Sequence, residues 1–151
     1  MHTVKSLSAL LLATTLLAAC NGPTQATEQA TERASGTYCF LHAVNKDTIA
    51  VSLTLEGDSV KGTMRWQPWE KDGANGELTG VRQPNGELDL LYNYVIEGSS
   101  QSETKIMRVT GDILLVKTGP LVDPNHDGNL RYQDVRLATF SDTLRRVSCP
   151  D

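Results

Sequence analysis

From residue 37 onward, apolar and polar residues alternate along the chain with a period of two. Three stretches place their apolar residues on one side of an extended strand: residues 49–56, 59–66 and 88–96. Turn residues separate such stretches, and Gly57-Asp58, Asn85-Gly86 and Gly111-Asp112 predict hairpins. No stretch after residue 36 keeps the period of about 3.6 residues that marks an amphipathic helix. The sequence therefore predicts eight or nine short strands, with one strand beginning at Leu78 and a polar loop around residues 98–101.

The start of the chain has a different pattern. A weakly basic segment containing Lys5 precedes an uncharged run of Leu, Ala and Thr at residues 7–18. Such a run is typical of a secretory signal, and it is shorter than the roughly 20 residues of a membrane-spanning helix. The alternative is a buried helix of a soluble protein, which needs a polar face that only three Ser and Thr residues supply. We interpret residues 1–19 as a signal peptide.

The apolar run ends in Leu17-Ala18-Ala19-Cys20, which resembles the lipobox of bacterial lipoproteins. The resemblance implies cleavage before Cys20 and a lipid anchor on its thiol, so that the protein works in the cell envelope. The next residue is Asn21, not the Asp that retains lipoproteins in the inner membrane of enteric bacteria, which favours the outer membrane and leaves its face open. Residues 21–36 contain no large apolar side chain, so residues 20–36 are interpreted as a lipidated, flexible linker.

The charge of the chain excludes some partners. The full sequence has 14 basic and 18 acidic residues, and loss of residues 1–19 removes only Lys5, leaving 13 against 18. No basic patch is present, which argues against nucleic acid and anionic lipid headgroups as partners. The remaining 132 residues are enough for one domain with a core, which we place at residues 37–151.

Three cysteines are present, and a lipidated Cys20 leaves Cys39 and Cys149 near the two ends of this domain. In an oxidising compartment an even pair predicts a disulfide, the alternative being two buried free thiols. A disulfide requires the two Cα atoms to lie within about 7 Å of each other. The strand pattern fits a sandwich or a barrel, and in a closed meander barrel the first and last strands are neighbours, which removes both exposed edges. We therefore predict an all-β, antiparallel up-and-down barrel of about eight strands.

Three short segments support this fold by resemblance: Tyr38-Cys39-Phe40, Glu70-Lys71-Asp72-Gly73 and Arg146-Val147-Ser148-Cys149. Their arrangement, together with the glycine-rich hairpins, resembles small lipocalin-like lipoproteins of Bacteroidetes. The resemblance covers residues 37–149 and implies a barrel in the cell envelope. Those proteins mostly have no assigned activity, so it implies no function.

The segment from Asp123 to Asp134 resembles the calcium loop of EF-hands and dockerins. Hard oxygen ligands recur at loop positions 1, 3, 5 and 12, and a glycine at position 6 makes the sharp turn. The match predicts Ca²⁺ ligation by the side chains of Asp123, Asn125, Asp127 and Asp134 and by the backbone carbonyl of Asn129. The alternative is a polar hairpin loop, since Asp, Asn, Pro and Gly are also the residues that turns require. No helix is predicted before Asp123, unlike in the calcium-binding families.

Four aromatic residues are the candidate ligand-binding residues: Trp66, Trp69, Tyr92 and Tyr94. The two tryptophans could line a barrel mouth or stack on a planar ligand, and all four could instead only pack the core. Catalytic motifs are absent from the sequence: there is no Gly-x-Ser-x-Gly elbow and no His-Glu-x-x-His. We therefore expect a non-enzymatic, membrane-anchored barrel that binds a small apolar ligand or a protein. The alternatives are an inhibitor of lysozyme or another host enzyme, and a calcium-stabilised structural or adhesion module.

Overall fold

The computed structural model describes residues 35–150, which form one closed antiparallel β-barrel. The predicted signal peptide, Cys20 and most of the linker lie outside the described residues. Within the described part, no helix has the length and apolar character needed to cross a membrane.

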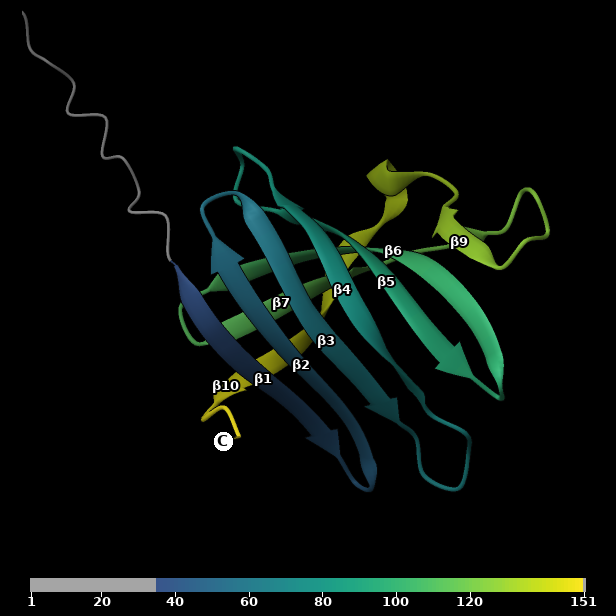
Figure 1. Cartoon of the computed structure of the whole chain (residues 1–151), viewed down its shortest axis with the longest axis horizontal. Helices are drawn as coiled ribbons and strands as arrows, with labels where there is room; N and C mark the ends of the chain where they lie inside the picture. The colour runs from purple at the N-terminus through teal and green to yellow at the C-terminus, as the bar shows by residue number, and fades with distance from the viewer. Residues whose placement is uncertain (1–34, 151) are drawn as a thin grey trace, which may run out of the picture. The chain divides into compact units, whose positions relative to one another are not determined.

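Seven strands follow one another up and down, each paired with the next along the chain (Figure 1): β1 (Gly36–Val44), β2 (Asp47–Glu56), β3 (Ser59–Gln67), β4 (Ala74–Arg82), β5 (Leu88–Ile96), β6 (Ser99–Thr110) and β7 (Ile113–Thr118). An excursion outside the barrel follows, made of three short elements: β8 (Leu121–Val122), β9 (Asn129–Tyr132) and the 3₁₀ turn η1 (Val135–Leu137). The last strand, β10 (Thr139–Val147), returns to the barrel.

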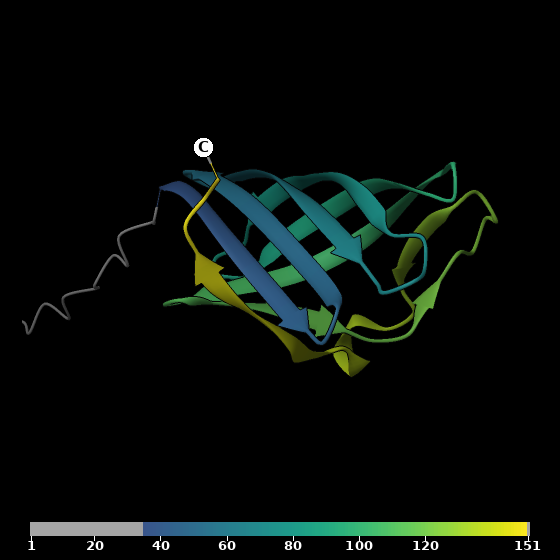
Figure 2. The ribbon, with the colours of Figure 1, turned by 90° about the horizontal axis from the view of Figure 1, so that it is seen from below.

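The barrel closes because β10 pairs with both β7 and β1, while β5 pairs with β6. The ring therefore contains eight strands in the order β1 to β7 followed by β10, and Figure 2 shows β1 and β10 side by side. Cys39 on β1 and Cys149, two residues after β10, form a disulfide with their Cα atoms 5.1 Å apart. The prediction of an up-and-down barrel of about eight strands is confirmed.

Two predicted boundaries differ from the structure. β4 begins at Ala74, four residues before the predicted start, because the small and polar residues 74–77 pair with β3 and residues 75–77 also pair with β5. The expected polar loop at residues 98–101 is a tight turn, and β6 already begins at Ser99. Glu97 and Gly98 make this turn with φ angles of 49° and 74°, the left-handed pair that suits the twist of a hairpin.

The two ends of the barrel differ. We call the end with the loops 57–58, 83–87 and 111–112 the packed end, and the end with the loops 45–46, 68–73, 97–98 and 119–138 the mouth. From the packed end to the middle, apolar side chains fill the interior almost without exposure: Phe40, Leu53, Leu55, Val60, Leu78, Leu88, Leu90, Met107, Leu114 and Leu144. The chain enters β1 at the packed end, so the mouth is the end remote from residue 36.

The excursion is joined to the edge of β6 near the mouth. β9 runs parallel to β6, with Ser102 opposite Asn129. The Tyr132 hydroxyl donates a hydrogen bond to the Lys117 carbonyl at 2.8 Å, which fastens the excursion to β7.

Candidate functional site

The mouth half of the barrel is hollow. A cavity of about 280 Å³ lies there, and its lining side chains come from every barrel strand except β1. A cavity bordered by seven strands of a closed ring is the lumen of that ring. The lining residues are Ile49, Met64, Trp66, Ala74, Tyr92, Tyr94, Ile96, Glu103, Lys105, Val116, Thr118, Asp142 and Leu144.

The strand order divides this lining into two walls. The adjacent strands β2 to β5 supply an apolar and aromatic wall: Ile49, Met64, Trp66, Ala74, Tyr92, Tyr94 and Ile96. The adjacent strands β6, β7 and β10 supply all the charged groups of the lumen, on Glu103, Lys105 and Asp142. A molecule in the lumen therefore meets an apolar surface on one side and charged groups on the other.

Two stacked tyrosines form the centre of the aromatic wall. The rings of Tyr92 and Tyr94 lie 4.6 Å apart at 14° to each other, as expected for residues two apart on one face of β5. The Tyr92 hydroxyl donates to the Met64 carbonyl at 3.0 Å, and the Tyr94 hydroxyl donates to Gln101 Oε1 at 2.9 Å. Both rings are held in place by these bonds, so this wall is formed before any ligand arrives.

The electrostatics of the lumen keep these hydroxyls protonated. Burial, reinforced by the negative charge of Glu103, raises the pKa of Tyr92 to about 12 and raises the pKa of Tyr94 as well. Neither phenol ionises near neutral pH, so the tyrosines act as hydrogen-bond donors rather than as bases.

The charged wall contains one ion pair and one unpaired carboxylate. Lys105 Nζ lies 2.5 Å from Glu103 Oε1, and both side chains are less than one-fifth exposed. The Asp142 side chain makes no hydrogen bond or ion pair with any residue in the described part of the chain. Asp142 lies one inward position closer to the mouth than Leu144 on β10, and Glu103 lies one closer than Lys105 on β6. An incoming ligand therefore meets Glu103 before Lys105.

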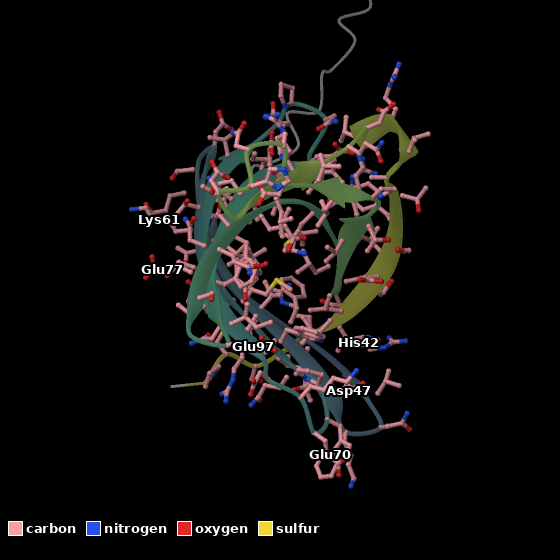
Figure 3. The ribbon with its side chains drawn as sticks, turned by 90° about the vertical axis from the view of Figure 1, so that its right-hand side faces the viewer. His42, Asp47, Lys61, Glu70, Glu77 and Glu97 are labelled. Carbon is pink, nitrogen blue, oxygen red and sulfur yellow. A yellow bond between two sulfur atoms is a disulfide. The ribbon has the colours of Figure 1, made fainter. Side chains whose placement is uncertain are left out.

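The lumen continues outward into a wider vestibule. This open space of about 600 Å³ shares Trp66 and Ile96 with the lumen and is completed by Glu70, Lys71, Asp72 and Glu97. In Figure 3 the labelled residues His42, Asp47, Glu70 and Glu97 lie in the lower half of the view, while Lys61 and Glu77 point outward at its left edge.

The structure brings together three of the four predicted aromatic site residues. Trp66, Tyr92 and Tyr94 line the lumen, with Trp66 38% exposed at its entrance. Trp69 does not border the lumen or the vestibule and does not cap the core, since it is 51% exposed. Its backbone N–H donates to Asp47 Oδ1 at 2.6 Å and its ring lies 3.4 Å from Lys46 Nζ. These contacts tie the loop at 68–73 to the turn at 45–46.

The predicted calcium residues lie in the excursion. Asp123 Oδ2 accepts a hydrogen bond from Gly128 N at 2.9 Å, and Asp127 Oδ1 accepts one from Asn129 N at 3.0 Å. Asp134 caps η1 and pairs with Arg136, whose Nη2 lies 2.7 Å from Asp134 Oδ2.

In these contacts, several oxygens that are predicted to bind Ca²⁺ accept hydrogen bonds from the protein itself. Across residues 35–150, no three His, Cys, Asp or Glu side chains are grouped to hold a metal ion. Calcium binding therefore stays a prediction, and Asn125 stays a predicted ligand with the other four residues.

Sequence reasoning missed Glu103, Lys105 and Asp142 as site residues. The signal for the first two is the alternation along β6, where residues 101, 103, 105, 107 and 109 share the inward face. Charged residues at inward positions of a barrel strand indicate a lumen that is not filled with apolar side chains. Asp142 lacked even this signal, because an irregularity between Phe140 and Asp142 shifts the alternation of β10.

Comparison with protein families, with curated proteins and with solved structures found no match.

Proposed function

We propose that this chain is a lipid-anchored envelope protein whose barrel holds a small, largely apolar ligand in the mouth half of its lumen. The observation that carries the proposal is the cavity of about 280 Å³ with an apolar wall from four adjacent strands. Ligand pockets typically measure about 300–1,000 Å³ and are mainly apolar with a few placed polar groups. The lumen, at about 280 Å³, lies just below that range, which favours a compact ligand over a long-chain lipid.

Two structural features support binding at this place. The tyrosine wall is fixed by hydrogen bonds, so little order is lost when a ligand packs against it. The packed end is filled by buried apolar side chains, so a ligand enters and leaves through the mouth.

The orientation of the barrel fits a tether at the N-terminal side. The chain enters β1 at Gly36, at the packed end. A lipid on the predicted Cys20, followed by a flexible linker, would leave the mouth free to meet ligand.

Ligand binding is tested with a neutral fluorescent probe, N-phenyl-1-naphthylamine. We expect its fluorescence to rise on addition of the protein and this rise to be lost in Ala74→Leu, which adds bulk to the lumen wall. Ala50→Leu is the matched control, because Ala50 is exposed on β2 and borders neither space at the mouth. Thr118→Leu provides a second lumen variant, at an exposed position of the lining. Probe binding that survives both lumen variants would exclude the lumen as the site.

The anchor is tested separately in native cells. We expect the purified protein to begin at Cys20 and to carry acyl mass, and Cys20→Ser to move the protein from the membrane fraction to the soluble fraction. A product that keeps Met1 and carries no acyl group would exclude the lipoprotein assignment without affecting the ligand proposal.

The inhibitor alternative is distinguished by an assay of lysozyme with and without added protein. Inhibition that persists in Ala74→Leu would point to a protein partner at the surface. Loss of probe binding in the same variant would still assign the lumen to a small ligand.

A further inference from the structure

The net negative charge of the described residues is concentrated at the mouth. Residues 35–150 contain 15 Asp and Glu and 12 Lys and Arg. The lumen and vestibule together are lined by five of these carboxylates and by only two lysines, as follows: Glu70, Asp72, Glu97, Glu103 and Asp142 with Lys71 and Lys105. The remaining ten acidic and ten basic residues balance. The net charge of −3 on residues 35–150 therefore equals the excess at the mouth.

The lysine inside the lumen does not offset this excess of negative charge for an incoming ligand. Lys105 is paired with Glu103 at 2.5 Å, and Glu103 lies nearer the mouth. An anionic ligand would have to pass the vestibule carboxylates, to separate this pair and to share the lumen with Asp142. A cationic ligand needs no such rearrangement, because Asp142 has no partner among the described residues.

The opposite wall suits the rest of such a ligand. Trp66, Tyr92 and Tyr94 present aromatic surface to the lumen, and Ile49 and Ile96 add aliphatic surface. Aromatic faces attract ammonium groups as well as apolar rings, so this wall does not oppose a nearby positive charge. A cleft with carboxylates on low-dielectric walls also concentrates cations and speeds their entry.

We propose that the lumen selects a small cationic amphiphile, with an ammonium group beside Asp142 and an apolar, preferably aromatic body against the β2–β5 wall. This inference rests on the proposed function, because it names the class of ligand for the same cavity. The cavity defines the binding site, and the distribution of charge across its two walls defines the chemical class of the ligand. A basic protein docked on the mouth would use the vestibule carboxylates but would not reach the lumen wall.

The test uses three naphthalene probes of similar shape and different charge: 1-naphthylmethylammonium, 1-naphthalenemethanol and 1-naphthoate. They are titrated by calorimetry into the full chain carrying Cys20→Ser, which avoids detergent. We expect the ammonium probe to bind best, the alcohol to bind roughly fivefold more weakly and the carboxylate to bind most weakly, as for one exposed charge pair. The preference should shrink between about 0.1 M and 1 M salt, because the Debye length falls from about 10 Å to about 3 Å.

Asp142→Asn is the discriminating variant. It should weaken binding of the ammonium probe roughly three- to fivefold and leave the alcohol unchanged. Asp89→Asn is the matched control, since Asp89 is an exposed carboxylate on β5 that borders neither space. Far-ultraviolet circular dichroism of both variants checks that the barrel is intact.

The outcomes separate this inference from the function on which it rests. Equal binding of the ammonium and alcohol probes, or tighter binding of naphthoate, would overturn the cationic class and leave the lumen site standing. Binding of the ammonium probe that is unchanged in Asp142→Asn would overturn the role of Asp142. Failure of all three probes to bind, or binding that Ala74→Leu and Thr118→Leu leave unchanged, would overturn the lumen site itself.

Discussion

Lys105 and Glu103 form an ion pair inside the barrel, with Nζ and Oε1 2.5 Å apart and side-chain exposures of 17% and 14%. The two residues are two positions apart on β6, so both point into the lumen. A charge at this depth has lost most of its water, and its partner replaces the lost hydration. Removing one partner leaves the other charge without compensation.

We therefore expect Glu103→Gln and Lys105→Met each to lower the free energy of unfolding by about 2 kcal/mol, less than for a fully buried pair because some exposure remains. The double variant should lose clearly less than the sum of the two, because it leaves no unpaired charge. Urea denaturation of the four proteins gives the coupling energy directly. Additive losses would show that the two charges do not depend on each other.

A second charge cluster on the outer face predicts sensitivity to acid. Glu87 Oε1 lies 2.9 Å from Arg108 Nη2 and 3.1 Å from Lys117 Nζ, and both cations lie over the Phe140 ring. Burial alone would raise the pKa of Glu87, but the hydrogen bond and charge of Lys117, with smaller contributions from Asn85 and Arg108, bring that pKa below its ordinary value of 4.5.

The sign of the effect follows from that lowered pKa. The ionised Glu87 stabilises the folded state fully above pH 4.5, and this contribution is lost as pH falls through the lower folded pKa. We expect Glu87→Gln to be less stable than the wild type at pH 7 and to lose less stability between pH 5 and pH 3. Glu77→Gln, on the outer face of β4, is the control and should keep the wild-type slope. Equal slopes in Glu87→Gln and the wild type would contradict the assignment.

How far the sequence predicted the fold depended on which residues form the strands. The alternation from Ile49 to Leu55 fixes the inward face of β2, and the structure buries Val51, Leu53 and Leu55 as expected. The start of β4 was not predictable, because Ala74-Asn75-Gly76 resembles a loop until its neighbours are known. A Cβ on Gly76 would lie 2.0 Å from the Asn93 carbonyl oxygen, so the strands approach closely there and only glycine fits.

The candidate site was only partly predictable, for a different reason. Aromatic residues at inward positions, such as Trp66 and Tyr92, give the same alternating pattern whether they fill a core or line a cavity. The difference is set by what lies opposite them across the barrel. Glu103 and Asp142 lie on strands that the chain reaches later, and the closure of β10 onto β7 and β1 brings them to the same lumen.

The disulfide predicts a large effect of reduction. Cys39 and Cys149 are 110 residues apart and join the first strand to the end of the last. Closing a loop of that length stabilises by about 5 kcal/mol in the chain-entropy model. We expect the double variant Cys39→Ala/Cys149→Ala to unfold at clearly lower urea than the oxidised wild type. A reductant should lower the urea midpoint of the wild type to that of the double variant, and it should leave the midpoint of the double variant unchanged. If the reductant does not change the urea midpoint of the wild type, the disulfide does not stabilise the barrel.

The loop from Asp123 to Asp134 predicts a competition between calcium and arginine. In the EF-hand pattern the last carboxylate of the loop must turn onto the ion. Asp134 instead accepts hydrogen bonds from Arg136 N, at 2.9 Å, and from Arg136 Nη2, at 2.7 Å, and this pairing lowers the pKa of Asp134. A calcium ion that used Asp134 would have to break the side-chain pair.

We expect calcium to raise the melting temperature of the wild type, and Arg136→Ala to give a larger rise at the same calcium concentration, because the variant frees Asp134. The stabilisation should follow RT ln(1 + [Ca²⁺]/Kd), so a tenfold tighter site adds up to about 1.4 kcal/mol at saturating calcium. Asp123→Ala should abolish the rise in both backgrounds. Thermal melts with and without excess calcium give the shift for the wild type, Arg136→Ala, Asp123→Ala and the double variant. If the wild type does not shift, or if Asp123→Ala shifts equally, the segment is a polar turn whose aspartates serve its own backbone amides.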